Sequence, residues 1–554
     1  MEKVELYRER SLTKFSIKNN LLYNINFSLV LLSLIFLCTT KPLFAVLHSQ
    51  KSTIAQTTYG KVKGYIDSGI KVFKGIPYGA DTRNRRFLPP EPPKPWKGIR
   101  NAARFGSMAP QPLFHGGSLN FFPQPKNQKV SEDCLNLNVW TPALHDGFKR
   151  PVMVYFHGGA YSNGSENIDL YDGVNLCRKG NVVVVTVNHR LNVFGFLYLG
   201  ELGGKKYAES GNAGMLDLVL ALKWVKNNIA EFGGDPGNVT IFGQSGGGAK
   251  CATLMGMPAA KGLFRKVITM SGQQITGRTK EHATKTALDI LKKLNIGRKD
   301  IDELNKVPMN KLLEAMRGEQ FAPVTDGIVL PRDPFYPVAS TISKNIPMML
   351  GNTHDETTFL IGGKNPSLFH LSWKELPGKI EQYVKKFIGN IKPDSIIAFY
   401  RHLYPEYSPS DVFFAATTAA RSWKSLVVEE DIRTEQNGAP TYVYELDWQT
   451  PVYGGEFKAP HTLDIPLAFD NIKYGASMTG TGPGAYKMAD IVSSTFLAFA
   501  KTGNPNNPKI PFWPAFNLKD RPTMIFNLKP KVVDDPRGAE RRFFENVPYI
   551  QPGT

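Results

Sequence analysis

The sequence predicts an α/β fold, in which helices cover both faces of a mostly parallel central β-sheet. The main evidence is a series of fully apolar runs of strand length, separated by stretches with helical patterns: Val152–Phe156, Val182–Val187, Val239–Phe242, Val267–Met270, Met348–Leu350 and Tyr442–Leu446. Runs that are apolar at every position are typical of strands buried on both faces. A chain of 554 residues with 42% hydrophobic residues can also bury a large core. Since α/β enzymes of this length often form one unit, residues 50–550 are expected to form a single domain.

One helix is expected directly before the run Val239–Phe242. Its residues recur near helical spacing, with one face predicted to be apolar and the other polar: Leu216, Val219, Leu220, Trp224 and Ile229 against Asp217, Lys223 and Lys226. Glycine and proline continue a helix poorly, so the helix should end at the stretch 233–236. The order strand, helix, strand is a βαβ unit, which agrees with a parallel sheet.

Other parts of the chain are expected to lie at the edges of this sheet. Between residues 57 and 78, short alternating stretches broken by glycines predict antiparallel edge strands. The segments 276–320 and 364–440 carry charged helical patterns, and no long Gly/Ser linker separates them from the rest. We interpret them as helical insertions that cap the sheet.

The first 45 residues differ from the remainder. Five Lys and Arg residues precede a 12-residue apolar run at positions 27–38, and Leu43-Phe44-Ala45 follows. This order of a basic region, a short apolar region and a small residue is typical of a secretory signal peptide, here residues 1–45. The apolar run is shorter than the ~20 residues that a bilayer-spanning helix needs. We therefore expect a secreted or periplasmic protein, the alternative being a membrane anchor through residues 27–38 if the signal is not cleaved.

Charge and cysteine content argue against several classes of protein. The net charge is +19, but the basic residues are scattered and accompany no nucleic-acid-binding motif, so a solvated basic surface and no nucleic-acid partner are expected. Beyond the signal only Cys134, Cys177 and Cys251 remain. Their wide spacing and odd number predict neither a disulfide framework nor a zinc site.

No cofactor or metal site is expected. The stretch from Gly243 to Lys250 nearly spells a phosphate-binding loop, but Ala249 spoils the spacing and no Ser or Thr follows the lysine. The glycine-rich stretch 480–484 lacks the preceding strand of a dinucleotide site, and no H-E-x-x-H motif is present.

A G-x-S-x-G motif, Gly243-Gln244-Ser245-Gly246-Gly247, stands at the end of an apolar run. In the nucleophile elbow of α/β hydrolases, a sharp strand-to-helix turn exposes the serine hydroxyl, and small flanking residues avoid clashes. The N-terminus of the following helix then faces the negative charge that develops in the reaction. By itself the motif also fits an ordinary glycine-rich turn.

A second motif follows the run Val152–Phe156, where His157-Gly158-Gly159-Ala160 begins. An oxyanion hole needs backbone N–H groups aimed at the oxyanion, and small residues let a substrate approach that backbone. Gly158, Gly159 and Ala160, together with Gly246, are the candidate donors. The similar sequence at 115–117 follows no apolar run and is interpreted as an ordinary turn.

A serine nucleophile needs a base, and the base needs a carboxylate to orient it. In α/β hydrolases the chain order is Ser, then Asp or Glu, then His. His461 fits as the base because it lies in a loop after the late run Tyr442–Leu446. Asp355 and Glu356 both follow the run Met348–Leu350, and spacing alone does not choose between them.

From about residue 55 to 545 the chain resembles the type-B carboxylesterases, the cholinesterase-like branch of the α/β hydrolases. The resemblance rests on the elbow, the His461 loop and five further stretches: FKGIPY (73–78), EDCLNL (132–137), NHRL (188–191), GN (211–212) and THDE (353–356). It implies the α/β-hydrolase fold, with helical insertions capping the active site, and hydrolysis of small carboxylic esters without a cofactor. By this resemblance the catalytic acid is Glu356, and Ser271 is a supporting serine beneath the triad of Ser245, Glu356 and His461.

The chain departs from the family pattern at several positions. Gln244 stands where many relatives have Glu, and Ala160 where many have a third glycine. Family members usually pair the Cys134 position with an upstream cysteine, where this chain has Ala109, so that bridge is expected to be absent. The loop 111–131 contains no tryptophan, so choline esters are not expected to be favoured substrates.

Two other functions remain open at this point. The same triad can act on amides, thioesters or lactones. A non-catalytic binding protein of the cholinesterase-like type is the second alternative, although such proteins typically lack a triad member and all three positions are filled here. Asn163-Gly164-Ser165 is a glycosylation sequon within the oxyanion loop, where a glycan would block entry, so we expect Asn163 to be unmodified.

Overall fold

The computed structural model describes residues 52–112, 121–126 and 128–552. The predicted signal peptide, residues 1–45, and the alternative anchor at 27–38 lie outside the described residues. The chain divides into two compact units, Met1–Ser52 with Leu144–Asp146, and Thr53–Ala143 with Gly147–Thr554. All strands and helices of the described ranges belong to the second unit.

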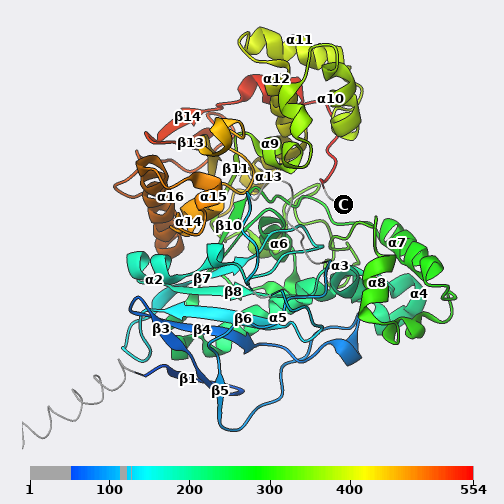
Figure 1. Cartoon of the computed structure of the whole chain (residues 1–554), viewed down its shortest axis with the longest axis vertical. Coiled ribbons are helices and arrows are strands. Elements are labelled where there is room, and N and C mark those ends of the chain that lie inside the picture. Colours follow the sequence, from blue (N-terminus) through cyan, green and yellow to red (C-terminus); the bar gives the residue numbers. More distant parts are fainter. Residues whose placement is uncertain (1–51, 113–120, 127, 553–554) are drawn as a thin grey trace, which may run out of the picture. The chain divides into compact units, whose positions relative to one another are not determined.

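The core of this unit is a large mixed sheet. Its described strands are β3 (Tyr65–Asp67), β4 (Ile70–Pro77), β6 (Asn136–Thr141), β7 (Arg150–Phe156), β8 (Val183–Val187), β9 (Gly234–Gln244), β10 (Lys266–Met270), β11 (Met348–Thr353), β12 (Thr441–Leu446), β13 (Pro522–Phe526) and β14 (Lys531–Asp534). They lie in the order β14-β13-β12-β11-β10-β9-β7-β8-β6-β4-β3 (Figure 1). The strands from β13 to β8 are mutually parallel, and those at the two edges pair antiparallel. A smaller sheet consists of β1 (Ile54–Thr57), β2 (Gly60–Lys63) and β5 (Ile99–Asn101).

All six predicted apolar runs form adjacent parallel strands, which confirms the mostly parallel sheet. The predicted antiparallel edge strands are also confirmed, because β1 pairs with β2 and β3 with β4 in that sense. Strand β6 was not predicted, since asparagines interrupt its apolar pattern. The side chain of Asn138 is nevertheless buried, because it donates to Thr186 Oγ1 at 2.9 Å and accepts from Gly75 N at 2.9 Å.

Helices surround the sheet. Those described are α2 (Val174–Gly180), α3 (Asn192–Phe196), α4 (Gly200–Gly203), α5 (Ala213–Asn228), α6 (Gly246–Leu254), α7 (Lys280–Lys293), α8 (Met309–Ala315), α9 (Glu356–Leu360), α10 (Leu376–Val384), α11 (Pro393–Leu403), α12 (Pro409–Thr417), α13 (Lys424–Glu435), α14 (Asp464–Ala468), α15 (Ala476–Thr479), α16 (Pro483–Thr502) and α17 (Gly538–Phe543). Helices α5, α6, α13 and α16 pack on the sheet strands. In the described ranges, every helix is too short or too polar to cross a bilayer.

The two predicted helical insertions are confirmed. The segment 276–320 forms α7 and α8, and the segment 364–440 forms α10 to α13. Helices α10, α11 and α12 have an apolar core of their own and lie together beyond the sheet, as the yellow-green group of Figure 1 shows. A π-helical segment, Thr418–Trp423, joins α12 to α13.

Helix α5 is the predicted helix before Val239, but part of its predicted pattern is wrong. Leu216 and Leu220 are only half-buried, and Asp217, which was expected to face solvent, is 0% exposed. Asp217 accepts hydrogen bonds from Arg190, which lies in the loop after β8: from the backbone N at 2.9 Å, from Nε at 2.9 Å and from Nη2 at 2.7 Å. Charged residues are rarely buried unless they are paired. Here the partner is distant in sequence, so the helical pattern could not reveal it.

Candidate active site

The predicted site residues gather at the carboxyl edge of four adjacent parallel strands. Ser245 directly follows β9, Ser271 follows β10, Glu356 follows β11 and His461 lies in the loop after β12. Carboxyl ends of parallel strands share one edge of a sheet, where α/β proteins place their ligand sites. Strand pairing thereby brings Ser245 and His461 to the same edge, although more than 200 residues separate them in the sequence.

Ser245 occupies a strained turn between β9 and α6. Its φ of 58° and ψ of −128° lie in a region that L residues rarely adopt. The turn is held by a hydrogen bond from Ser245 N to Met270 O at 2.8 Å. The start of α6 approaches β7 so closely that a Cβ on Gly247 would lie 1.9 Å from Phe156 O. The glycines of the motif are therefore required by this packing, and Ser245 itself is partly exposed.

His461 and Glu356 form a buried pair beside this turn. His461 Nδ1 hydrogen-bonds to Glu356 Oε2, and Glu356 Oε1 accepts from Thr353 N at 3.0 Å. The side chains of both residues are almost fully buried. Asp355 points elsewhere, because its Oδ2 accepts from Ala459 N at 3.2 Å. Of the two acids that spacing could not separate, Glu356 is the one in contact with the imidazole.

Gln244 is the group closest to the other face of the pair. Its Nε2 lies 3.2 Å from His461 Nε2 and 3.4 Å from His461 Nδ1. Because the amide nitrogen is almost equidistant from both ring nitrogens, it lies against the face of the imidazole and leaves the in-plane lone pair of Nε2 open. No hydrogen bond joins Ser245 to His461 within the described chain. Such catalytic hydrogen bonds are often long in free enzymes and tighten when substrate binds.

The predicted oxyanion segments pack directly on the serine turn. A Cβ on Gly158 would lie 3.3 Å from Ser245 Cβ, and a Cβ on Gly246 would lie 2.3 Å from Ala160 O. Gly159 and Ala160 have φ values of 87° and 51°, so the loop turns sharply here. Ala160 is exposed, which leaves this side of the loop open to an incoming group.

The opposite side of the loop is held by its carbonyl groups. Each of four consecutive carbonyls accepts a hydrogen bond: His157 O from Lys250 Nζ at 3.0 Å, Gly158 O from His157 Nδ1 at 2.8 Å, Gly159 O from Ser162 N at 3.2 Å and Asn163 N at 3.1 Å, and Ala160 O from Lys250 Nζ at 2.8 Å. In a trans peptide the N–H points away from the C=O. The N–H groups of residues 158–160 donate to nothing in the described ranges, so they are available to a ligand.

Two ionisable residues near Glu356 were missed by the sequence analysis. Burial and the charge of Glu356 raise the pKa of Asp464 to about 8, so Asp464 is protonated at neutral pH. Arg421, from the π-helical segment, is the second: burial lowers the pKa of its guanidinium, whereas the charge of Glu356 acts in the opposite direction. π-helical segments are frequent at functional sites. Asp464 stands three residues after His461, which was the only sequence signal for it.

The neighbouring histidine, His354, belongs to a separate ion network. Its burial disfavours the charged ring, but Asp355 and Glu445 outweigh burial and raise the pKa of His354 to about 9. His354 Nδ1 lies 3.1 Å from Asp355 Oδ2. Its ring is therefore charged at neutral pH and contributes to the fold beside the site.

Ser271 lies close to the serine turn. A Cβ on the adjacent Gly272 would lie 2.1 Å from Ser245 O, and Ser271 N donates to Gly351 O at 2.7 Å. The buried Ser271 Oγ makes no hydrogen bond within the described residues. Its supporting role stays a prediction.

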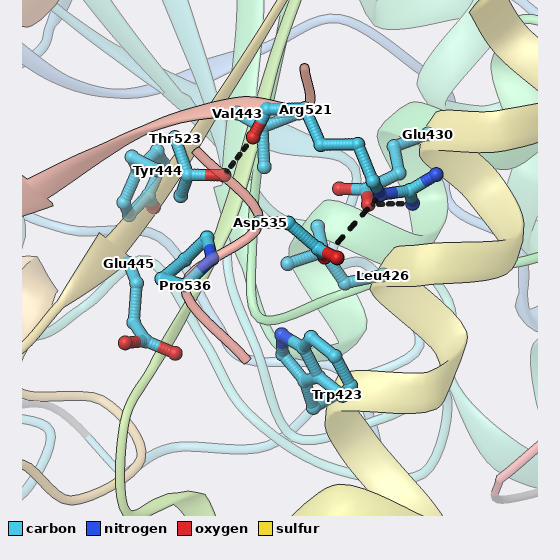
Figure 2. Close-up of a pocket in the computed structure, with 10 residues that line it drawn as sticks. All are labelled: Trp423, Leu426, Glu430, Val443, Tyr444, Glu445, Arg521, Thr523, Asp535 and Pro536. Carbon is cyan, nitrogen blue, oxygen red and sulfur yellow. Dashed lines mark hydrogen bonds and ion pairs between the residues drawn. The ribbon is translucent and has the colours of Figure 1, made fainter. Parts of the chain in front are cut away.

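A pocket lies away from Ser245, against α13, β12 and β13 (Figure 2). Its charged groups are already paired: Arg521 Nη2 contacts Glu430 Oε1 and Asp431 Oδ1, each at 2.6 Å. Figure 2 also shows Arg521 directed toward Asp535. These ion pairs tie β13 and the chain after β14 to α13, so we interpret the pocket as part of the scaffold.

Other reactive groups do not form sites in the described chain. Cys134, Cys177 and Cys251 are buried and free. Within the same described ranges, no group of three or more His, Cys, Asp or Glu residues is placed to hold a metal ion.

Comparison with known proteins gives consistent matches over most of the chain. The model of the Carboxylesterase family matches residues 51–544. Para-nitrobenzyl esterase of Bacillus subtilis (strain 168) is 36% identical over 507 residues, covering 88% of this chain and 98% of the relative. Phenmedipham hydrolase of Pseudarthrobacter oxydans is 30% identical, covering 85% and 94%. The crystal structure of a carboxylesterase of Geobacillus stearothermophilus at pH 6.2 has 38% identity and a TM-score of 0.78, covering 89% of this chain and 100% of that one. The chain therefore belongs to the type-B carboxylesterase family of hydrolases.

Proposed function

We propose that this protein hydrolyses small carboxylic esters with Ser245 as nucleophile, His461 as general base and Glu356 as the carboxylate that orients the base. One observation supports this most directly. A partly exposed serine in a strained elbow stands beside a buried His–Glu pair and a loop with unused N–H groups. Nucleophile, base, orienting acid and oxyanion donors are the groups that acyl transfer by serine needs.

The proposed reaction proceeds through an acyl-enzyme. His461 Nε2 takes the proton of Ser245 as its oxygen attacks the ester carbonyl, and Glu356 stabilises the resulting imidazolium through Nδ1. The N–H groups of Gly159, Ala160 and Gly246, with Gly158 as a further candidate, would hold the tetrahedral oxyanion. The imidazolium protonates the leaving alcohol. Water activated by the same histidine then releases the carboxylic acid.

The names of the relatives support an ester substrate. Para-nitrobenzyl esterase and the Geobacillus carboxylesterase are named for ester hydrolysis. Amides, thioesters and lactones use the same groups and are the alternatives within this class. Localisation outside the cytoplasm, after removal of residues 1–45, is part of the proposal and follows from the N-terminal sequence alone.

The test is hydrolysis of a p-nitrophenyl ester series by purified wild type and Ser245→Ala. We expect the variant to lose ~10⁶ in turnover, by analogy with serine proteases. A matched amide, thioester and lactone of the best acyl chain would be assayed in parallel. Equal rates in wild type and Ser245→Ala would contradict the serine mechanism. Faster turnover of the amide, thioester or lactone than of the ester would assign the enzyme to that substrate class.

The two adjacent acids provide a matched control. Glu356→Gln keeps the shape of the side chain but can no longer stabilise the imidazolium, and the corresponding change in a serine protease lowers turnover by ~10⁴. Asp355→Asn removes a charge one residue away that does not contact His461, so a much smaller loss is expected. If Asp355→Asn were the more damaging change, the assignment of the acid would be wrong.

A further inference from the structure

Lys250 is a buried amine that the proposed reaction does not use. It lies on α6, five residues after Ser245, and its side chain is fully buried. Its Nζ donates to His157 O at 3.0 Å and to Ala160 O at 2.8 Å, and it lies 5.5 Å from the centre of the Tyr161 ring. In the described chain no carboxylate lies within ion-pair distance of it. This is the lysine that made the elbow resemble a phosphate-binding loop.

Burial of an ammonium group without a counter-charge is unfavourable. It lowers the pKa of Lys250 to about 7. The ionisable groups that face Lys250 do not compensate the charge. His157 and His189 are buried, and their pKa values are lowered by burial first and by Lys250 second, to about 3 for His157. Cys251 is a buried thiol whose pKa is raised by burial.

The two carbonyls that Lys250 holds are at either end of the oxyanion loop. The His157 carbonyl belongs to the peptide that precedes Gly158, and the Ala160 carbonyl to the peptide that follows Ala160. Between them lie the peptides that carry the N–H groups of Gly159 and Ala160. Fixing both outer peptides restricts rotation of the inner ones. Ala160 needs this restraint most, because its φ of 51° is unfavourable for a residue with a side chain.

We propose that Lys250 is a positioning residue of the oxyanion hole, which clamps the loop 157–160 through its two hydrogen bonds and, in its ammonium form, places a positive charge behind the loop. The proposal rests on the function proposed above. An oxyanion in the hole would attract the ammonium through the intervening peptide groups, and this attraction is absent in the ground state. Lys250 should therefore act on kcat more than on KM, since it stabilises a charge that exists only in the transition state.

The experiment compares Lys250→Met, Lys250→Arg and wild type on one good ester. Methionine has a similar length but neither donors nor charge, whereas arginine keeps both. We expect Lys250→Met to lower kcat by about 10- to 100-fold, less than the ~10²–10³ for loss of a direct donor, with KM little changed. Lys250→Arg should recover part of that loss.

A second readout separates positioning from general stability. A trifluoromethyl ketone forms a tetrahedral adduct with the serine and carries the oxyanion, whereas the product carboxylic acid does not form such an adduct. Lys250→Met should weaken binding of the ketone in proportion to the fall in kcat and leave inhibition by the product acid unchanged. If binding of the ketone and binding of the product acid weaken equally, or if kcat is unchanged, the proposal is wrong.

Lys424 is the matched control. Lys424 begins α13, and it also donates to two backbone carbonyls, Phe544 O at 2.9 Å and Val547 O. Both carbonyls lie outside the oxyanion loop. Lys424→Met should lower the unfolding temperature without lowering kcat or ketone affinity. If Lys250→Met does not fold, Lys250→Gln, which keeps a polar group in the cavity, is used in its place. Equal kcat values in the Gln and Arg variants would then overturn the proposal.

The two proposals fail in different ways. A wild-type protein without esterase activity would refute the proposed function, whereas a Lys250→Met variant as active as wild type would refute only the role of Lys250.

Discussion

The buried pair of Asp217 and Arg190 gives a stability prediction that can be worked from the structure. The side chains are 0% and 1% exposed, and Asp217 accepts four hydrogen bonds from Arg190, two of them from Nε. Asp217→Asn keeps the shape but leaves the guanidinium without its counter-charge. Breaking a buried ion pair in this way costs about 3–5 kcal/mol. That is a large part of the 5–15 kcal/mol that typically stabilises a folded protein, so we expect a large loss.

Removing both charges should be less damaging than removing one. In the double variant Arg190→Met, Asp217→Leu no buried charge remains, and apolar replacement of a buried pair is often close to neutral. The main residual defect is the amide N of residue 190, which loses its acceptor at a cost of about 1–3 kcal/mol. The double variant should therefore be more stable than Asp217→Asn alone by about 2 kcal/mol.

The assay is urea-induced unfolding followed by tryptophan fluorescence, which Trp224 of the same helix makes sensitive to this region. Lys226→Ala, an exposed change on α5, is the control and should shift the midpoint little. The reasoning is refuted if Asp217→Asn unfolds at the midpoint of Lys226→Ala, or if the double variant is less stable than Asp217→Asn.

Three further predictions concern the surroundings of the site. The folded-state pKa of His354, about 9, lies above its ordinary 6.5, so its charge stabilises the fold fully below pH 6.5 and loses this effect as the pH rises through 9. His354→Gln should thus lower the free energy of unfolding at pH 6 by about 2 kcal/mol after solvent screening, and should not lower it at pH 10; a constant difference would contradict this. Gln244→Glu places a carboxylate beside His461 and stabilises the imidazolium, so the acid limb of the pH–rate profile should move to higher pH; an unmoved limb would exclude this effect. Gly247→Ala puts a methyl group 1.9 Å from Phe156 O, so soluble yield and kcat should both fall sharply, and near-normal kcat would show that the turn can relax.

The sheet and the elbow could be predicted because their causes are local. A strand buried on both faces is apolar at every position, and helices that pack closely on strand ends need glycine. Both requirements are visible in a few consecutive residues. Strand β6 escaped prediction because Asn138 is buried through hydrogen bonds to neighbouring strands, which no local pattern records.

The missed features depend on contacts between distant parts of the chain. Asp217 appeared solvent-facing because its partner, Arg190, lies beyond its own helix. Lys250 appeared only as a flawed motif because its partners are backbone carbonyls, which sequence does not distinguish. The choice of Glu356 over Asp355 needed the family resemblance, since adjacent carboxylates become distinguishable only once the loop fixes their directions.

The reacting groups stand at the ends of four neighbouring strands, whereas the helical insertions lie in the connections between those strands. Adjacent strands in a sheet are about 4.8 Å apart, and that interval is set by backbone pairing. The helical insertions enter between β10 and β11 and between β11 and β12, so they can lengthen or be exchanged without altering the interval. The insertions are thus free to diverge while the reacting groups keep their spacing. Grafting helices α10 to α12 of a relative, which have an apolar core of their own, would test whether this insertion sets the acyl preference while the reacting groups stay in place.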